Sequence, residues 1–251
     1  AAWPLRRRPP LANIASHSLA AAGSLLGGLC AVSVLIGQKT VISPPLAMPL
    51  GEVYLRVDSL SAWFLLALGI VGSAAGIYAV FYSREYYRRD FFLLAGLFNL
   101  FLLTMTLVFT AAHVAGFLIA WEMMAIVSFL LVNHEHEKSE TRRAAFIYVV
   151  MTHIGAAFLL AAFFLLGKAA GSLDFTRFAG AVQDQTTRNF IFVLILIGFG
   201  AKAGMIPLHI WLPRAHPAAP SHVSALMSGV MIKTAIYGIC RFLLDFLGPG
   251  P

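Results

Sequence analysis

Long runs of apolar residues alternate with short polar segments along the chain, and seven of these runs are long enough to cross a membrane. A helix rises about 1.5 Å per residue, so about 20 residues span a hydrocarbon core of roughly 30 Å. The pattern predicts an all-α, polytopic membrane protein, with a single transmembrane domain over residues 1–251. The predicted membrane helices cover residues 18–37, 59–82, 91–110, 113–132, 144–167, 189–213 and 219–246.

The third and fourth of these helices come from one apolar stretch over residues 91–132. This stretch is too long for a single crossing and long enough for two. It must therefore turn near residues 110–113, which predicts a tight, uncharged hairpin between two neighbouring helices.

Composition supports a membrane protein. Of the 251 residues, 59% are hydrophobic and 12% are charged, whereas soluble domains are about 45–50% apolar and about 25% charged. A chain of this size cannot bury so much apolar surface in one core, so a soluble globular protein is excluded and the lipid bilayer is an expected partner. The chain opens on Ala1 and closes on the sequence GPGP, and we expect it to be a piece of a longer protein.

The net charge of +7 is spread over the loops between the predicted helices. With the arginine-rich N-terminal segment placed in the cytoplasm, ten lysines and arginines fall in cytoplasmic loops and six in loops on the other side. This bias follows the positive-inside rule. It predicts a multi-pass protein of an inner (cytoplasmic) membrane, which we expect to be that of a bacterial or archaeal cell. No DNA-binding motif accompanies the charge, so nucleic acid is not an expected partner.

Three charged side chains fall inside predicted membrane helices: Glu122, Lys202 and Lys233. Each costs about 2.5 to 3.5 kcal/mol or more if it faces lipid. Ion pairs that hold helices together are one explanation, but a single acid cannot neutralise two bases. The other explanation is proton transfer, because desolvation favours a neutral amine and a nearby carboxylate favours a charged one. A changing distance between Glu122 and Lys202 would then load and release a proton.

Pro207 lies five residues after Lys202, within the predicted sixth helix. Proline lacks a backbone donor and clashes with the preceding turn, so this helix must kink or break deep in the membrane. Irregular backbone at that depth is tolerated only where it is buried in protein or lines a wet cavity. Gly200 and Gly204, on either side of Lys202, would allow water or a neighbouring helix to approach closely.

Histidines extend this polar line. If helical geometry continues through the break, His209 lies about 20° from the face of Lys202, and His222 lies about 20° from the face of Lys233. Imidazole can both give and take a proton near neutral pH. His209, His222 and His153, which lies midway along the fifth helix, are therefore candidate relay residues. Each is equally well explained as a residue that packs or caps a helix.

Other kinds of chemistry find no support in the sequence. The run from His134 to Glu137 lacks the second histidine of the zinc pattern HExxH, because Lys138 stands in its place. Nothing resembles a nucleotide-binding loop, a pair of haem ligands, an iron–sulfur cysteine set or a nucleophile with its base. We therefore expect no catalytic, cofactor-binding or metal-ligating residue in this chain.

One long motif resembles a known family. Residues 200–238 read GAKAGMIPLHIWLPRAHPAAPSHVSALMSGVMIKTAIYG. This stretch closely resembles the core motif of the antiporter-like membrane subunits of respiratory complex I and the group 4 hydrogenases. Its particular wording looks most like that of the large membrane subunit of hydrogenase-4 and formate hydrogenlyase complexes. The features that carry this similarity are Arg214 and the motifs DSLSAW, YSREY, WEMMA and GSLDF, which begin at residues 58, 82, 121 and 171.

The resemblance implies a 14-helix fold with two inverted five-helix repeats, in which the seven predicted spans correspond to helices two to eight. It places Glu122 on the family's fifth-helix glutamate and Lys202 on the lysine of the broken seventh helix. Lys233 falls on the eighth-helix lysine that passes protons onward. The first helix and the second repeat would lie outside this chain.

The implied function is proton translocation through a mid-membrane Glu/Lys/His relay, coupled to electron transfer in partner subunits. The implied partners are other membrane subunits of one complex and a peripheral arm with Ni-Fe and iron-sulfur centres, or with flavin and quinone. This chain would be a non-redox subunit of an oxidoreductase complex, with no cofactor of its own. Two alternatives stay open: a multisubunit cation/proton antiporter subunit, and a non-conducting structural scaffold whose charges dock neighbouring subunits.

Overall fold

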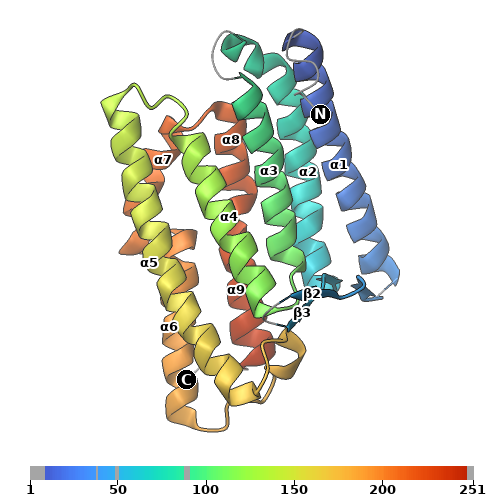
Figure 1. Cartoon of the computed structure of the whole chain (residues 1–251), viewed down its shortest axis with the longest axis vertical. Coiled ribbons are helices and arrows are strands. Elements are labelled where there is room, and N and C mark those ends of the chain that lie inside the picture. The colour runs from blue at the N-terminus through green and yellow to red at the C-terminus, as the bar shows by residue number, and fades with distance from the viewer. Residues whose placement is uncertain (1–8, 38, 49–50, 88–90, 248–251) are drawn as a thin grey trace.

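The computed structural model describes residues 9–37, 39–48, 51–87 and 91–247, which form a bundle of long helices (Figure 1). Within these residues seven helical segments are long and apolar enough to cross a membrane. The predicted all-α, seven-helix membrane architecture is thereby confirmed. The α-helices are α1 (Pro9–Gly37), α2 (Ser59–Tyr82), α3 (Phe91–Thr110), α4 (Val114–Val132), α5 (Ser139–Ala170), α6 (Gln185–Ala203), α7 (Leu212–Ala218), α8 (Ser221–Leu226) and α9 (Ile232–Ile239).

Two crossings are composite. The sixth combines α6, the 3-10 helix η4 (Leu208–Trp211) and α7. The seventh combines α8, the π-helix η5 (Met227–Met231), α9 and a second π-helix, η6 (Cys240–Phe246). A further 3-10 helix, η2 (Ser83–Tyr86), continues α2 at the end of the second crossing, and η3 (Phe175–Arg177) lies in the connection between α5 and α6.

Several helices extend beyond the apolar stretches that predict them. The first begins at Pro9, well before residue 18, and α5 covers Ser139–Ala170 where the apolar stretch covers 144–167. Hydropathy marks only the part of a helix that lipid can surround, whereas the helix itself continues for as long as its backbone hydrogen bonds do. Proline at the start of α1 is tolerated because the N–H it lacks has no partner within the first turn.

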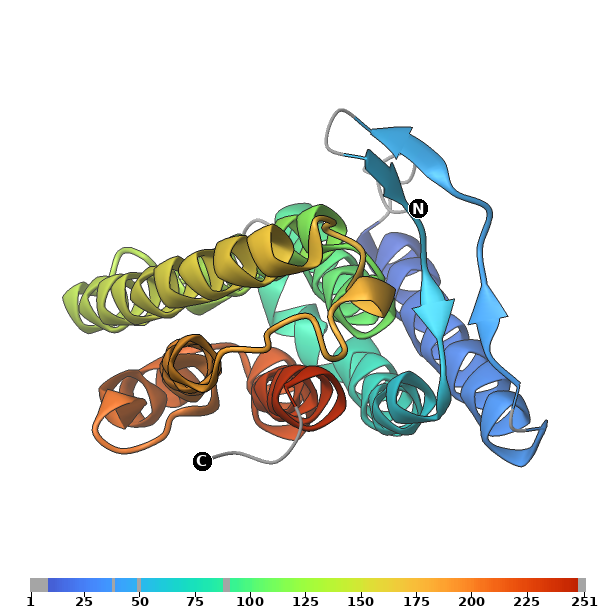
Figure 2. The same ribbon diagram turned by 90° about the horizontal axis from the view of Figure 1, so that it is seen from below.

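Four short strands, which the hydropathy pattern does not predict, connect α1 to α2. Strands β1 (Val41–Ile42) and β4 (Arg56–Val57) pair antiparallel, as do β2 (Leu46–Met48) and β3 (Gly51–Val53). Figure 2 shows them beside one end of α1. Strands of two or three residues are too short to display the alternation by which strands are recognised.

The bundle has two distinct ends. The strands lie at one end, which we call the hairpin end (Figure 1). At the other end α2 and α4 finish and α5 begins, and its described basic residues are Arg84, Lys138, Arg142, Arg143 and Arg214. We call this the basic end. By the positive-inside rule it is the end expected to face the cytoplasm.

Glycines allow two helix pairs to approach closely. A Cβ atom on Gly69 of α2 would lie 2.6 Å from the Cα atom of Gly28 in α1. In the same way, a Cβ atom on Gly155 of α5 would lie 2.8 Å from the carbonyl oxygen of Gly198 in α6. Small residues at such crossings are typical of helices that associate within membranes, where close backbone contact replaces the hydrophobic driving force. The α5–α6 crossing fixes the frame of the candidate site.

The predicted break in the sixth crossing is confirmed, but it begins three residues before Pro207. Helix α6 ends at Ala203, and Gly204 adopts the left-handed conformation with φ 73°. The chain then turns and resumes as η4 and α7. The indole N–H of Trp211 donates to the backbone oxygen of Ala201 over 2.8 Å, so the second segment stays attached to the end of the first.

Candidate functional site

Lys202 lies in the last turn of α6 and is 1% exposed. Its Nζ atom donates to the hydroxyl oxygen of Tyr148, in α5, over 2.7 Å. Because α6 stops one residue later, this side chain sits beside the break rather than in the middle of a continuous helix. A cation at the C-terminal turn is favoured by the helix dipole, but only by about 0.3–1 kcal/mol at an exposed position.

Tyr148 connects Lys202 to α4 and to the seventh crossing. Its hydroxyl lies 2.6 Å from the Ser128 Oγ atom and 3.4 Å from the Met231 sulfur. Ser128 can donate to the backbone oxygens of Met124 and Ala125. With its single proton used there, Ser128 accepts from Tyr148, which in turn accepts from Lys202. The result is a directed chain of hydrogen bonds from the lysine into α4.

Glu122 is separate from this chain. Within the described part of the molecule Lys202 forms no ion pair, and the Glu122 carboxylate instead lies 3.4 Å from the Nε2 atom of His153. The two side chains of that pair are 35% and 49% exposed, Glu122 being the more covered. The charge of Glu122 acts on Lys202 through space only. Glu122 and Lys202 therefore do not form an ion pair in this conformation, and the predicted dependence of Lys202 on its distance from Glu122 stays a prediction.

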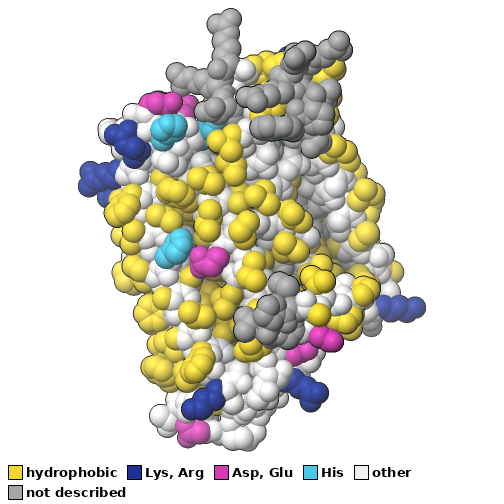
Figure 3. All heavy atoms as spheres, in the orientation of Figure 1, with side chains coloured by type: hydrophobic (Ala, Val, Ile, Leu, Met, Phe, Trp, Pro, Cys, Tyr) yellow, Lys and Arg dark blue, Asp and Glu magenta, His cyan; other side chains and the backbone are white. Residues whose placement is uncertain are grey.

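The Glu122–His153 pair joins α4 to α5 on an outer face of the bundle. Figure 3 views that side, where hydrophobic side chains cover most of the surface between the two ends. His153 also contacts the backbone oxygen of Val149, one turn earlier, through Nδ1 at 2.9 Å. With Nδ1 donating to that carbonyl, the neutral ring has Nε2 as its basic nitrogen, which faces Glu122.

Lys233 and His209 lie on the surface of the described chain. Lys233, in α9, is exposed, and its Nζ donates to the backbone oxygen of Ser228. His209 is also exposed, in η4. The helical spacing that aligned His209 with Lys202 does not hold, because the α-helix ends at Ala203 between them.

His222 occupies a different environment from Lys233. It is fully buried in α8, near the basic end, and packs against His17 and Tyr82. The spacing of eleven residues does not align the two side chains, because the π-helix η5 intervenes and a π turn holds more residues than an α turn. The structure therefore joins neither His209 nor His222 directly to a predicted lysine.

The sequence alone does not mark Tyr148 and Ser128 as site residues. Hydroxyl side chains are common in membrane helices, and neither carries a charge that would single it out. The distances between α4, α5 and α6 were needed to identify them.

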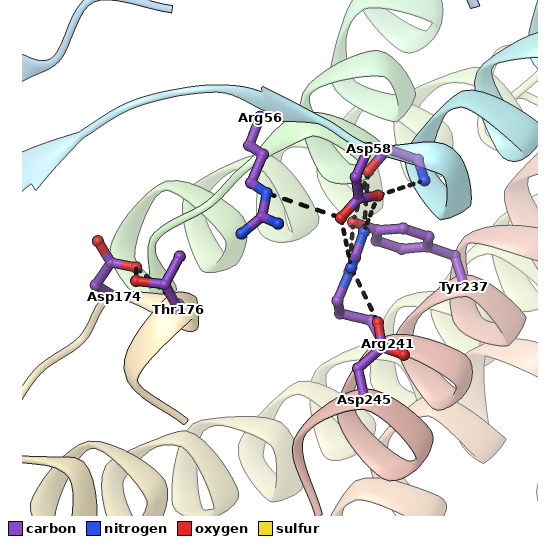
Figure 4. Close-up of polar contacts among 8 residues, drawn as sticks. Arg56, Asp58, Asp174, Thr176, Tyr237, Arg241 and Asp245 are labelled. Atoms are coloured by element: carbon purple, nitrogen blue, oxygen red, sulfur yellow. Dashed lines mark hydrogen bonds and ion pairs between the residues drawn. The ribbon is translucent and has the colours of Figure 1, made fainter. Parts of the chain in front are cut away.

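A second polar cluster lies at the hairpin end (Figure 4). Asp58 caps the N-terminus of α2 by accepting from the Ser61 N–H over 3.0 Å. Arg241, in η6, donates to both carboxylate oxygens of Asp58, at 2.6 and 2.8 Å, and also to Asp245 at 3.0 Å. Arg56 adds a weaker contact with Asp58 at 3.8 Å.

In the hairpin-end cluster, Asp58, Arg241 and Asp245 are joined by hydrogen-bonded ion pairs, whereas Arg56 makes only the longer contact. Burial alone disfavours the Asp58 carboxylate, but its hydrogen bonds to Arg241 and Ser61 hold the pKa of Asp58 below its ordinary value. A cavity of about 250 Å³ adjoins the cluster and is lined in part by Asp58, Tyr237 and Arg241. The matched charges make this an ion-paired link between α2 and the end of the seventh crossing.

The described residues contain no group of three or more His, Cys, Asp or Glu side chains that could hold a metal ion. The site at Lys202 consists of an amine, two hydroxyls and a thioether. The amine and the two hydroxyls can exchange protons, whereas the thioether can only accept a weak hydrogen bond.

Residues 111–250 match the family model described as NADH:quinone oxidoreductase/Mrp antiporter, TM. The chain is 44% identical over 220 residues to an uncharacterised protein of Mycobacterium tuberculosis (strain H37Rv), covering 86% of this chain and 33% of that protein. It is 37% identical over 231 residues to hydrogenase-4 component B of Escherichia coli (strain K12), covering 89% and 34%. The chain thus spans about a third of the length of these relatives.

The fold is similar to that of a solved Mrp complex from Dietzia sp. DQ12-45-1b, with a TM-score of 0.77 at 20% identity. The likeness covers 95% of this chain and 47% of that one, and at this identity it concerns the fold alone. The family match, by contrast, includes α4 to α9 and therefore every residue of the Lys202 site. The chain belongs to the NADH:quinone oxidoreductase/Mrp antiporter transmembrane family, as an antiporter-like membrane subunit of the superfamily that includes complex I, hydrogenase-4 and Mrp.

Proposed function

We propose that this chain forms the proton-loading part of a membrane subunit that translocates protons in an oxidoreductase complex of the hydrogenase-4/formate hydrogenlyase or complex I type. The observation that carries the proposal is the environment of Lys202. Its amine is buried at a helix break, its hydrogen-bond partner is the neutral hydroxyl of Tyr148, and no carboxylate pairs with it among the described residues.

A buried ammonium group without a counter-ion is destabilised by several kcal/mol. The free energy of the neutral amine is then close to that of the ammonium form, so the same nitrogen can hold a proton in one state and lack it in another. Tyr148 suits both states, because its hydroxyl can accept from an ammonium group or donate to an amine. The tyrosine would keep Lys202 in place while its charge changes.

Glu122 and His153 would control this exchange from α4 and α5. Their contact at 3.4 Å gives the carboxylate a partner that can itself gain or lose a proton. A protonated His153 would neutralise Glu122 and weaken its influence on Lys202, whereas a neutral ring would leave the carboxylate charge unopposed. Lys233, which is exposed on α9, would pass the proton onward, and His209 and His222 would be further relay residues.

The electron-transfer chemistry would belong to partner proteins. We propose other membrane subunits of the same complex and a peripheral arm with Ni-Fe and iron-sulfur centres, or with flavin and quinone, in a bacterial or archaeal inner membrane. Support comes from the similarity to a component of hydrogenase-4 and from the exposed pair Glu122–His153, since a polar pair at this depth calls for cover by another membrane protein.

The test uses the full-length subunit in its assembled complex, in sealed membrane vesicles with a pH-sensitive dye. Lys202→Ala should lower proton translocation by about 100-fold, as expected for loss of a proton-transferring group, and Glu122→Gln should lower it less. The matched control is Lys168→Ala, which removes an exposed lysine at the end of α5 and should leave translocation unchanged.

Two outcomes would replace the proposal. If Lys202→Ala and Glu122→Gln leave both proton translocation and coupled turnover intact, the charges are structural and the chain is part of a scaffold. If the same variants abolish sodium-dependent growth at alkaline pH, and no redox activity accompanies transport, the chain is part of a cation/proton antiporter. The similarity in fold to a solved Mrp complex keeps this second candidate open.

A further inference from the structure

We propose that His17 and His222 form a second protonatable site at the basic end of the bundle, in which buried water bridges the two imidazoles and carries an exchangeable proton. The inference rests on the proposed proton-translocating function and extends it to a place distinct from Lys202. His17 lies in α1 and His222 in α8, so the site spans the first and last crossings of the chain.

The two rings face one another inside the bundle. Their centroids lie 6.1 Å apart in an edge-on arrangement, and both side chains are fully buried. Phe98, in α3, packs against both, at 5.4 Å from His17 and 5.1 Å from His222. Tyr82, in α2, packs against His222 at 5.3 Å. Four helices thus enclose the pair.

The hydrogen bonds of Asn13 define the state of His17. The side-chain amide of Asn13 donates to the backbone oxygen of Val80 over 2.7 Å and to the hydroxyl of Tyr87 over 2.8 Å. Its carbonyl oxygen therefore accepts from Nδ1 of His17, over 2.7 Å. A neutral His17 carries its hydrogen on Nδ1, which leaves Nε2 as a free base.

That base has no partner. Within the described residues, Nε2 of His17 and both ring nitrogens of His222 are buried without a hydrogen bond. Each such atom costs about 1–3 kcal/mol if it stays unsatisfied. Polar atoms in this position are normally satisfied by buried water, which makes two to four hydrogen bonds. A bridging water has three nitrogens to bind here.

Unsatisfied polar atoms concentrate at this end of the molecule. In the described residues, five of the six buried side-chain atoms without a partner belong to His17, His222, Ser83 and Asn133. Ser83 follows Tyr82 directly in the chain, and Asn133 precedes His134, whose ring packs on Tyr86 at 5.1 Å. The concentration points to a wet region that reaches from the histidine pair toward the surface of the basic end.

The groups around the pair favour a single proton. The titratable side chains near it are Tyr82 and Tyr86 from α2 and η2, and Tyr87, which contacts Asn13. His134 and Glu135 from the loop after α4 and Glu85 from η2 lie farther out. The contacts with α3 are aromatic. Neither imidazole has an ion-pair partner among the described residues, and like charges so close oppose one another, so protonation of one ring disfavours protonation of the other.

The pair is separate from the Lys202 site. Met231, which contacts Tyr148, follows His222 by nine residues along the same crossing. At 1.5 Å per residue the two lie roughly 13 Å apart along the helix. The hydroxyls of Tyr82 and Tyr86, 3.4 Å apart, continue from the pair in the opposite direction, toward His134. The pair would take up protons on the expected cytoplasmic side before they reach the interior.

The test compares three variants in the assembled complex. His222→Phe keeps a ring of similar size but removes both nitrogens, and it should expel the water. His222→Gln keeps groups that bind water but cannot titrate in this range. Phe98→Leu is the control for disturbed contacts, because Phe98 touches both histidines. Buried water is detected by radiolytic hydroxyl labelling of the fully buried Phe98 side chain, and proton transfer by translocation into sealed vesicles.

In the wild type we expect labelling of Phe98, although its side chain is fully buried, with loss of this labelling in His222→Phe and its retention in His222→Gln. Both histidine variants should lower proton translocation by about tenfold or more, with Phe98→Leu close to wild type. An unlabelled wild type would overturn the wet site, and unchanged translocation in both histidine variants would overturn the proton role. A loss of proton translocation in Phe98→Leu equal to that in the histidine variants would also overturn the proton role. Labelling that follows the expected pattern in a complex that does not pump would reject the proposed function and keep the wet site.

Discussion

The Lys202 site and the hairpin-end cluster show two ways of placing charge inside one helix bundle. At the hairpin end, Arg241 binds both oxygens of Asp58 and also Asp245. At the break, Lys202 has one neutral hydroxyl as its partner. A matched ion pair strongly prefers one protonation state and one geometry. A buried amine without a counter-ion has no such preference for either. The first arrangement fastens helices, and the second can change charge.

The sharpest way to break this comparison is to remove one charge from each region. Asp58→Ala leaves the largely buried Arg241 with the more exposed Asp245 as its one remaining ion-pair partner among the described residues, and it also removes the cap of α2. We expect a loss of about 3–5 kcal/mol in the free energy of unfolding, as for other broken buried pairs. Lys202→Met should be neutral or stabilising, because it replaces an uncompensated charge with an apolar side chain of similar length.

The measurement is thermal unfolding of the purified subunit in detergent, followed by circular dichroism. Asp245→Ala serves as the control, because its carboxylate is about half exposed and a surface pair contributes only about 0.2–1 kcal/mol. A Lys202→Met variant that unfolds as readily as Asp58→Ala would show that the lysine also fastens helices, and the distinction between the two regions would be lost.

The same substitution made in both regions gives a smaller, sharper test. Tyr148→Phe removes the hydrogen-bond partner of Lys202 and should cost about 1–3 kcal/mol, because a buried donor is left unsatisfied. Tyr237→Phe removes a hydroxyl that contacts Arg241 over 3.4 Å, while the two carboxylates remain. We expect at most about 1 kcal/mol there. The free energy of unfolding of both variants is measured by urea or guanidinium titration. Equal losses in the two variants would show that Lys202 does not depend on Tyr148 as its partner.

The smallest expected effect is a pH dependence that belongs to the hairpin end. The folded-state pKa of Asp58 lies below its unfolded value of about 3.9. Its stabilisation is therefore complete above roughly pH 5 and is lost as the pH falls through the depressed pKa. Melting temperatures of the wild type should fall more steeply below pH 4 than those of Asp58→Asn. Parallel curves for the two proteins would assign the acid sensitivity to other carboxylates.

The sequence predicted the membrane architecture well because hydropathy depends on runs of about 20 residues, which lipid selects directly. It also identified Lys202 and Glu122, since charges in such runs stand out. It could not predict that Glu122 faces His153, because that depends on how α4 and α5 are rotated against one another. The polar partners Tyr148 and Ser128 carry no signal at all until three helices are placed together.

Helical periodicity failed wherever the helix itself was irregular. The alignment of His209 with Lys202 assumed an α-helix that in fact ends at Ala203 with Gly204 in the left-handed conformation. Pro207 predicted a break, but a proline determines neither the residue at which the preceding helix ends nor the direction in which the chain continues. Those depend on tertiary contacts such as the bond from Trp211 to Ala201.

The π-helix η5 amounts to a one-residue insertion absorbed without a loop. Over residues 227–231 the seventh crossing therefore contains one residue more than an uninterrupted α-helix of the same length. Everything after that point is turned by about 100° relative to what precedes it. Deleting one residue there, such as Val230, should join α8 to α9 as one regular α-helix and turn Lys233 to another side of the bundle while leaving His222 where it is. The direction in which Lys233 points is thus determined by the length of the chain at residues 227–231.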